Sequence, residues 1–340
     1  MGTTKSRNTK LLILSLILSI IVIITVLFLT VDENTISYLT KVQPQFFLLA
    51  ILLQLLAWFI WGARISLMAR MVEPKKRISI KESFTIVIAN LFLAAVTPSM
   101  AGGEPVRIHL LSKKGFSTGC ATAVVLGERV FDAIFILTMV PFALTVFQYI
   151  INIREVKIGL IVGIILFIAG VTLFFYAVAR PEKSKRMLSR LFGKMRKRVG
   201  WVEKIEGFVD EFHRGGKLIF KKGNSKGIIT IFLVTALSWF IGFLVPSCIL
   251  LGLGHSPVIV QSIAAQILLL IIVMIPTTPG SSGVAELGAS ALFSSFVNVS
   301  ILGVFIVLWR FITYYFNIIV SGVFQYKVLK SVVKNSSTPR

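Results

Sequence analysis

Seven charged side chains lie within or beside long apolar stretches of this 340-residue chain, and their types could do chemistry. They are Glu104, Arg107, Glu128, Arg129, Asp132, Glu286 and Arg310. An ionisable group at the centre of a bilayer costs several kcal/mol, so each needs an opposite charge or a water-filled cavity. Because an arginine binds phosphate through two parallel hydrogen bonds, the set predicts a central phosphate site. The alternative is that the charges pair only with one another and hold helices together.

Two interrupted apolar segments precede these charges. The first contains T-P-S-M-A-G-G-E at 97–104, and the second contains T-P-G-S-S-G-V-A-E at 278–286. Pro98 lies 31 residues before Arg129, and Pro279 lies 31 residues before Arg310, so the chain resembles an internal duplication offset by 181 positions. Gly/Pro-interrupted segments at corresponding places in two halves indicate a transporter's binding site. The residues predicted to break the helices are Pro98, Gly102, Gly103, Pro276, Pro279, Gly280 and Gly283.

The composition predicts the class of protein. Hydrophobic residues make up 56% and charged residues only 15% of the chain, and the mean hydropathy is +0.88. These values exclude an ordinary soluble globule and predict an all-α integral membrane protein, a polytopic helical bundle forming one domain over 1–340. The net charge of +22 comes from loops and tails. We therefore expect anionic membrane lipids, and not nucleic acid, as the partner of the basic surface.

Segment lengths predict six full spans and two re-entrant hairpins. The spans are Leu11–Thr30, Gln45–Ala69, Thr118–Tyr149, Ile158–Ala179, Ile228–Leu251 and Ile301–Tyr326. One hairpin follows the second span and the other follows the fifth, so repeat one covers about 11–150 and repeat two about 158–328, with inverted topology. If both interrupted segments crossed completely, eight spans would place the termini on the same side.

The excess of Lys and Arg sets the predicted orientation. The basic loop 180–227 and both termini should be cytoplasmic, in a multi-pass protein of the cell membrane. Within the loop, apolar residues at helical spacing are consistent with an amphipathic helix on the membrane surface. A solvated connector is the alternative.

Enzyme signatures are weak. The sequence has no nucleotide-binding G-x-x-x-x-G-K-[ST] loop, its three histidines lack metal-ligand spacing, and its two cysteines do not cluster. We therefore expect no enzymatic activity, no cofactor and no metal.

Three motifs in order, T-P-S-M-A-G-G-E-P-V-R, V-V-L-G-E-R-V-F-D and I-P-T-T-P-G-S-S-G-V-A-E, resemble the flippase-like transmembrane family. That family includes the amino-terminal membrane part of bacterial lysylphosphatidylglycerol synthases, the multiple-peptide-resistance proteins. The resemblance implies movement of a phospholipid or lipid-linked head group between leaflets, with the seven charged residues lining a polar cavity. The chain ends at Arg340 without the soluble aminoacyl-transferase domain, so synthase activity is not expected.

Partners and alternatives follow from the same resemblance. A homo-oligomer or a separate lipid-modifying enzyme would be a natural partner of the chain. The alternative functions are a small-solute secondary transporter and a non-transporting membrane scaffold with structural ion pairs.

Overall fold

The computed structural model describes residues 20–21, 23–25, 27–30, 35, 38, 40, 42–95, 97, 102–148, 154–192, 201–221, 223–273, 278 and 280–324. Within these ranges the ordered elements are helices, and no strand is present. The chain is therefore an all-α polytopic membrane protein, as the composition predicts. The predicted helix breakers Pro98, Pro276 and Pro279 lie outside the described residues.

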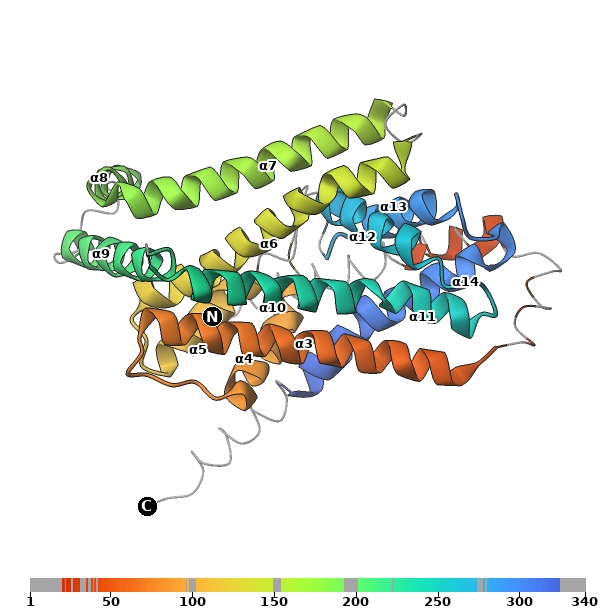
Figure 1. Cartoon of the computed structure of the whole chain (residues 1–340), viewed down its shortest axis with the longest axis horizontal. Coiled ribbons are helices and arrows are strands. Elements are labelled where there is room, and N and C mark those ends of the chain that lie inside the picture. Colours follow the sequence, from red (N-terminus) through yellow and green to blue (C-terminus); the bar gives the residue numbers. More distant parts are fainter. Residues whose placement is uncertain are drawn as a thin grey trace, which may run out of the picture.

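The helices run mostly along the long axis of the molecule (Figure 1). They are α3 (Pro44–Val72), α4 (Ile80–Ala95), α5 (Gly103–Lys113), α6 (Thr118–Val146), α7 (Arg154–Ala179), α8 (Pro181–Phe192), α9 (Trp201–Ile219), α10 (Ser225–Phe243), α11 (Val245–Gly252), α12 (Ile259–Val273), α13 (Val284–Phe293) and α14 (Val299–Arg310), which continues into the π-helix η3 (Phe311–Tyr315).

Five helical segments are long and apolar enough to cross a membrane. They are Pro44–Val72, Thr118–Val146, Lys157–Ala179, Ser225–Gly252 and Val299–Phe324. They correspond to the second to sixth predicted spans, because runs of 23 to 29 apolar residues exceed the roughly 20 that a bilayer core requires. The first predicted span, Leu11–Thr30, lies mostly outside the described residues.

Local hydrogen bonds fix where several helices begin. The Ser79 hydroxyl accepts from the Glu82 backbone, and the Glu82 carboxylate accepts from the Ser79 N–H, which forms a capping box before α4. Ser117 caps α6 through the Cys120 N–H, and Asn298 caps α14 through the Ser300 N–H. These polar residues between apolar runs give each helix a defined start.

Two pairs of short helices occupy the interrupted segments. The pair α4 and α5 lies near the end of the bundle where α8 and α9 lie, and the pair α12 and α13 lies toward the opposite end (Figure 1). With 16 and 11 residues in the first pair and 15 and 10 in the second, each helix is shorter than a full span. The re-entrant hairpins and the inverted repeat stay predictions, with which this arrangement agrees.

The helix starts repeat at one interval. Helices α3, α5 and α6 begin at 44, 103 and 118, and α10, α13 and α14 begin at 225, 284 and 299, so the members of each pair are 181 residues apart. The Ser238 hydroxyl also donates to the Ala57 carbonyl at 3.2 Å, and these two positions are separated by 181 residues. Contact between equivalent positions is expected where an approximate two-fold axis relates two halves.

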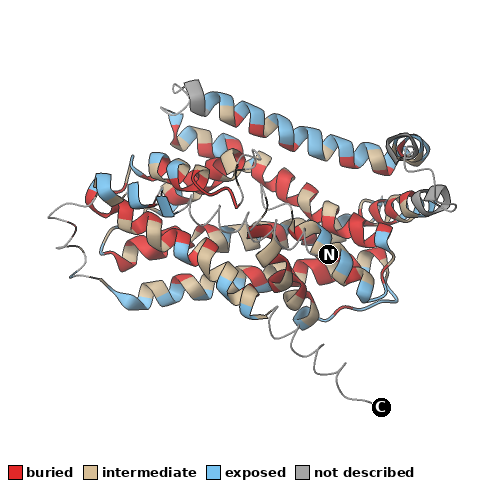
Figure 2. Cartoon of the chain, turned by 180° about the vertical axis from the view of Figure 1, so that it is seen from behind, coloured by how far each residue is buried: buried red, intermediate tan, exposed pale blue. Residues whose placement is uncertain are grey.

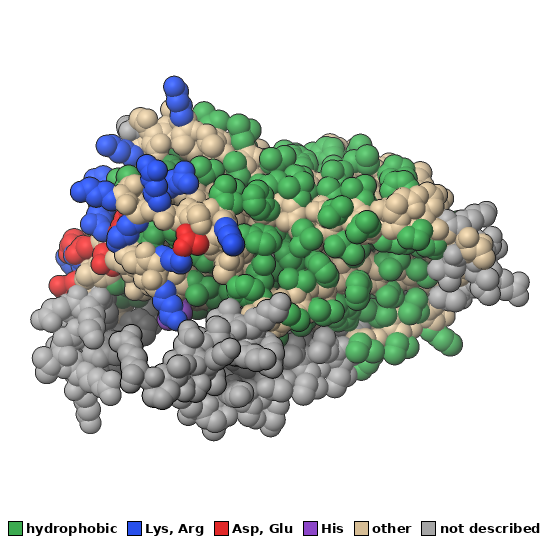
Figure 3. Space-filling view, turned by 90° about the horizontal axis from the view of Figure 1, so that it is seen from below, with side chains coloured by type: hydrophobic (Ala, Val, Ile, Leu, Met, Phe, Trp, Pro, Cys, Tyr) green, Lys and Arg blue, Asp and Glu red, His purple; other side chains and the backbone are tan. Residues whose placement is uncertain are grey.

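The buried core and the apolar exterior follow the membrane class. Interior faces of the central helices are buried, whereas α7 is largely exposed (Figure 2). Figure 3 shows hydrophobic side chains over most of the visible surface and Lys and Arg gathered at one end. An apolar exterior suits contact with lipid tails, and the basic end suits the anionic face of a membrane.

The loop predicted over 180–227 contains two basic helices. In α8, Arg186 and Met187 are both exposed. In α9, Val209, Phe212 and Ile219 are buried, and the Glu211 carboxylate accepts a hydrogen bond from the Gly119 N–H at 3.1 Å. Helix α9 therefore packs against α6, which differs from a helix that lies only on the membrane surface.

Candidate functional site

A network of six charged side chains joins three helices. Arg64 comes from α3, Glu104 and Arg107 from α5, and Glu128, Arg129 and Asp132 from α6. Five of the seven sequence-predicted site residues thus lie together. The network contains three guanidinium groups and three carboxylates, so its formal charges balance.

Glu128 lies at the centre of the network. Its side chain is fully buried, and its two oxygens divide between two arginines: Oε1 accepts from Arg64 at 3.2 Å, and Oε2 accepts from Arg107 at 2.7 Å. The Trp61 indole N–H also donates to Oε1 at 2.9 Å. Three charge-assisted or polar donors therefore stabilise one carboxylate, which is the arrangement that a buried charge requires.

Asp132 lies one helical turn beyond Glu128 and faces the same arginine. Arg64 Nη1 donates to Asp132 Oδ1 at 2.5 Å, and the Trp239 indole N–H donates to that oxygen at 2.9 Å. Arg64 also donates to the hydroxyl of Thr235 at 3.2 Å. Since Thr235 and Trp239 belong to α10, the network connects the first half of the chain with the second.

Four residues of this site were missed by reasoning from the sequence. They are Trp61, Arg64, Thr235 and Trp239. The available signal was Arg64 itself, a charge inside an apolar span that also needs a partner. Trp61 precedes it by one helical turn, so the two side chains face the same side of α3. No spacing signal indicated that α10 would contribute.

Exposure separates two members of the network from the rest. The side chains of Arg64, Arg107, Glu128 and Asp132 are 6% exposed or less, whereas Glu104 is 22% and Arg129 41% exposed. Arg129 also makes the longer ion pairs, at 3.4 Å to Glu104 and 3.3 Å to Asp132. The accessible part of the network is thus one base beside one acid.

The accessible pair retains hydrogen-bonding capacity. Glu104 Oε2, Arg107 Nε and Arg129 Nε are buried and have no hydrogen-bond partner among the described residues. The Trp61 ring lies 5.2 Å from the Arg107 guanidinium and 5.9 Å from that of Arg129. This part of the site therefore combines an aromatic face, an exposed guanidinium and unsatisfied polar atoms.

The other two predicted residues form a separate buried pair. Arg310 Nε donates to Glu286 Oε1 at 2.7 Å, and Glu286 Oε2 accepts from the Gly283 N–H at 2.7 Å at the start of α13. Arg310 Nη2 also donates to the Gly280 carbonyl at 3.1 Å. Arg310 thus holds the start of α13 and the preceding interruption against α14.

Arg129 and Arg310 occupy equivalent positions but different surroundings. Each lies 11 residues after the start of its helix, at Thr118 and Val299, or about 16 Å along the axis. That distance is about half of a 30 Å hydrocarbon core. Arg310 is 3% exposed, whereas Arg129 is 41% exposed. The two arginines therefore do not enter one network in the described structure, in contrast to the predicted shared central cavity.

The two chain interruptions meet each other. The Gly280 N–H donates to the Thr97 carbonyl at 3.1 Å, and the Tyr314 hydroxyl donates to the Ala95 carbonyl at 3.0 Å. Gly102, another predicted helix breaker, donates its N–H to the Thr97 hydroxyl at 2.7 Å. Gly103 is buried against Asn90 of α4. Backbone groups that the breaks free are thus satisfied at this junction.

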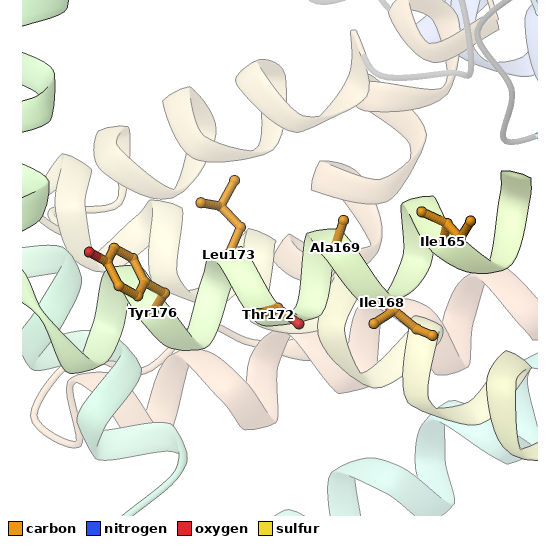
Figure 4. Close-up of a pocket in the computed structure, with 6 residues that line it drawn as sticks. All are labelled: Ile165, Ile168, Ala169, Thr172, Leu173 and Tyr176. Atoms are coloured by element: carbon orange, nitrogen blue, oxygen red, sulfur yellow. The ribbon is translucent and has the colours of Figure 1, made fainter.

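A shallow apolar concavity lies apart from the charged residues. Figure 4 shows its lining, which comes entirely from α7. The lining residues are Ile165, Ile168, Ala169, Thr172, Leu173 and Tyr176. It has no charged group and suits an acyl chain better than a polar head group.

The basic end contains exposed ion pairs. Lys114 donates to the Glu82 carboxylate, and this bond, with those from the Ser79 N–H and hydroxyl, lowers the pKa of Glu82 to about 2. Lys185 bonds to Asp210 and Glu182, which raises the pKa of the lysine. Among the described residues no group of three or more His, Cys, Asp or Glu side chains is arranged to hold a metal ion.

Comparison with known proteins follows the same division of the chain. The lysylphosphatidylglycerol synthase TM region matches residues 12–321, which include both interruptions and the whole charged network. A UPF0104 membrane protein of Archaeoglobus fulgidus is 33% identical over 336 residues, covering 96% of this chain and 100% of the relative.

More distant relatives carry the same description. The UPF0104 membrane protein of Pyrococcus horikoshii is 25% identical, covering 95% of this chain and 99% of its own length. That of Methanocaldococcus jannaschii is also 25% identical, covering 91% and 92%. No solved structure matches the chain. With a match over nearly its whole length, the protein belongs to the family of the lysylphosphatidylglycerol synthase TM region.

Proposed function

We propose that this protein moves a phospholipid or lipid-linked head group between the two leaflets of the membrane. The observation that carries the proposal is an accessible arginine, Arg129, about halfway along a membrane-spanning helix and joined to a buried ionic network. A guanidinium at this depth can bind a lipid phosphate through two hydrogen bonds as the head group crosses. The family supports a lipid, since its name refers to a phospholipid synthase.

The proposal assigns transport and no catalytic step to this chain. It also places the chain in the cell membrane with both termini and the basic end at the cytoplasmic face, where Lys and Arg meet anionic lipids. A second copy of the chain or a separate lipid-modifying enzyme is the partner we propose.

A structural role is the second candidate, and one observation favours it. Arg310 and Glu286 are fully paired and buried, which is sufficient to hold α13 against α14 without any ligand. A scaffold of this kind needs its ion pairs but no accessible arginine. The test must therefore separate Arg129 from the buried pairs.

Reconstitution into vesicles that contain fluorescent lipids provides the test. Wild-type protein should expose inner-leaflet lipid to dithionite without added nucleotide. Arg129→Lys should insert normally and slow this movement by tenfold or more, about the 1.4 kcal/mol of one lost charge-assisted contact. The exposed Arg180 of the basic end provides the control, since Arg180→Lys should leave the rate unchanged.

Two results would contradict the proposal. No lipid movement by stable wild-type protein would support the scaffold, and uptake of a soluble solute without lipid movement would support a small-solute transporter. A wild-type rate in Arg129→Lys would remove Arg129 from the pathway.

A further inference from the structure

The composition of the accessible pair indicates the charge of the ligand. A site for an anion alone is usually built with an excess of positive groups, as in clusters of arginines around phosphate. Here the only two network members more than 6% exposed are Arg129 and Glu104, which carry opposite charges 3.4 Å apart. A ligand at this position therefore meets a base and an acid together.

The strengths of the ion pairs indicate which side chain exchanges partners. Arg64 and Arg107 approach their carboxylates to 2.5 and 2.7 Å and are buried, so leaving them would expose an uncompensated charge. Arg129 is half-exposed and has contacts of 3.3 and 3.4 Å. Arg129 is thus the group that can turn toward a phosphate at the least cost.

The departure of Arg129 changes the balance of what remains. Without it, the network holds two arginines, Arg64 and Arg107, against three carboxylates. Glu104 Oε2 already lacks a hydrogen-bond partner among the described residues, and it would also lose its ion pair with Arg129. A cationic group on the same ligand would restore the balance, since an ammonium can donate to the vacated carboxylate.

We infer that the head group recognised here is zwitterionic, with a phosphate that binds Arg129 and an ammonium that binds Glu104. This inference rests on the proposed lipid movement and names the chemical class of its substrate. A purely anionic head group would engage Arg129 and leave Glu104 and Asp132 with less compensation. The nearby Trp61 ring, which faces both Arg107 and Arg129, offers an ammonium a second favourable contact.

The test compares two lipids in one vesicle composition. Vesicles of equal parts phosphatidylcholine and phosphatidylglycerol receive a trace of phosphatidylethanolamine or phosphatidylglycerol, each labelled on an acyl chain so that its head group stays intact. Wild-type protein should move the ethanolamine lipid about tenfold faster, the factor expected from one additional charge-assisted contact. Because both probes experience the same bilayer, the ratio reports the head group alone.

Variants test the residue assigned to the ammonium. Glu104→Gln removes the accessible negative charge, so the preference should disappear or reverse toward phosphatidylglycerol. Glu82→Gln is the matched control, because Glu82 is an exposed carboxylate outside the network, at the start of α4, and should leave the ratio unchanged.

The outcomes separate this inference from the proposed function. Equal wild-type rates for the two probes, with clear protein-dependent movement, would overturn zwitterion recognition and leave lipid movement intact. No movement of either probe would overturn the proposed function itself. A preference for the ethanolamine lipid that survives in correctly inserted Glu104→Gln would overturn the role of Glu104.

Discussion

Replacement of Gly280 by alanine tests whether contact between the two interruptions holds the halves of the protein together. Gly280 has a φ of +59°, where an L-residue with a Cβ is disfavoured by about 1–2 kcal/mol. An added Cβ would also lie 2.5 Å from the Tyr314 hydroxyl oxygen and 2.6 Å from the Ala95 carbonyl oxygen. Relief of such overpacking typically costs about 1–3 kcal/mol. Together these effects predict a loss of about 2–5 kcal/mol.

Two glycines of the same chain separate the contributions. Gly223 has a φ of +96° but no atom within 4 Å of an added Cβ, so Gly223→Ala should show only the conformational cost. Gly170 lies in α7 with open space around it, and Gly170→Ala should be neutral or stabilising by up to about 1 kcal/mol. The order of stability should therefore be Gly170→Ala, Gly223→Ala and Gly280→Ala.

Unfolding in mixed micelles by titration with SDS, followed by tryptophan fluorescence, measures these differences. The Gly280→Ala protein should unfold at the lowest SDS fraction and should also lose the hydrogen bond from Gly280 to Thr97. If Gly280→Ala were as stable as Gly223→Ala, the close approach of the two interruptions would not contribute to stability. That result would refute the packing argument.

Four further predictions concern charge and topology. Arg310→Lys should insert normally but lose either its Glu286 or its Gly280 contact, slowing lipid movement tenfold or more, about 1.4 kcal/mol; a wild-type rate would exclude a bidentate role. Glu128→Ala should destabilise the protein by about 3–5 kcal/mol in SDS titration, because two buried arginines lose their shared partner; a change below 1 kcal/mol would contradict the network. Cysteines placed at Lys217 and Ser256 should be labelled from opposite sides of the membrane, and labelling from one side would exclude the proposed topology. The pKa of Glu82 falls from 4.5 unfolded to about 2 folded, so its contribution is present above pH 4.5 and disappears toward pH 2; Glu82→Gln should therefore melt below wild type at pH 7 and match it near pH 2.

Local sequence features allowed the helices and their interruptions to be predicted. The five described spans are continuous apolar runs, and such runs must satisfy their backbone groups internally whatever surrounds them. The short helices α5 and α13 begin just after runs of Gly, Ser and Pro, at Gly103 and Val284. Sequence periodicity also indicated the common interval of 181 residues, because a duplication preserves the order of spans and breaks.

The choice of partners depended on tertiary packing. The sequence indicated that Glu128 and Asp132 needed compensation, but not that Arg64 would reach both of them, because that contact depends on how α3 crosses α6. Spacing likewise made Arg129 and Arg310 equivalent. Only the packing of neighbouring helices left Arg129 half-exposed and enclosed Arg310 with Glu286. Hydrophobicity and segment length are properties of a single stretch of chain and so determined the membrane fold, whereas exposure and ion pairing depend on several helices at once and were decided by the tertiary structure.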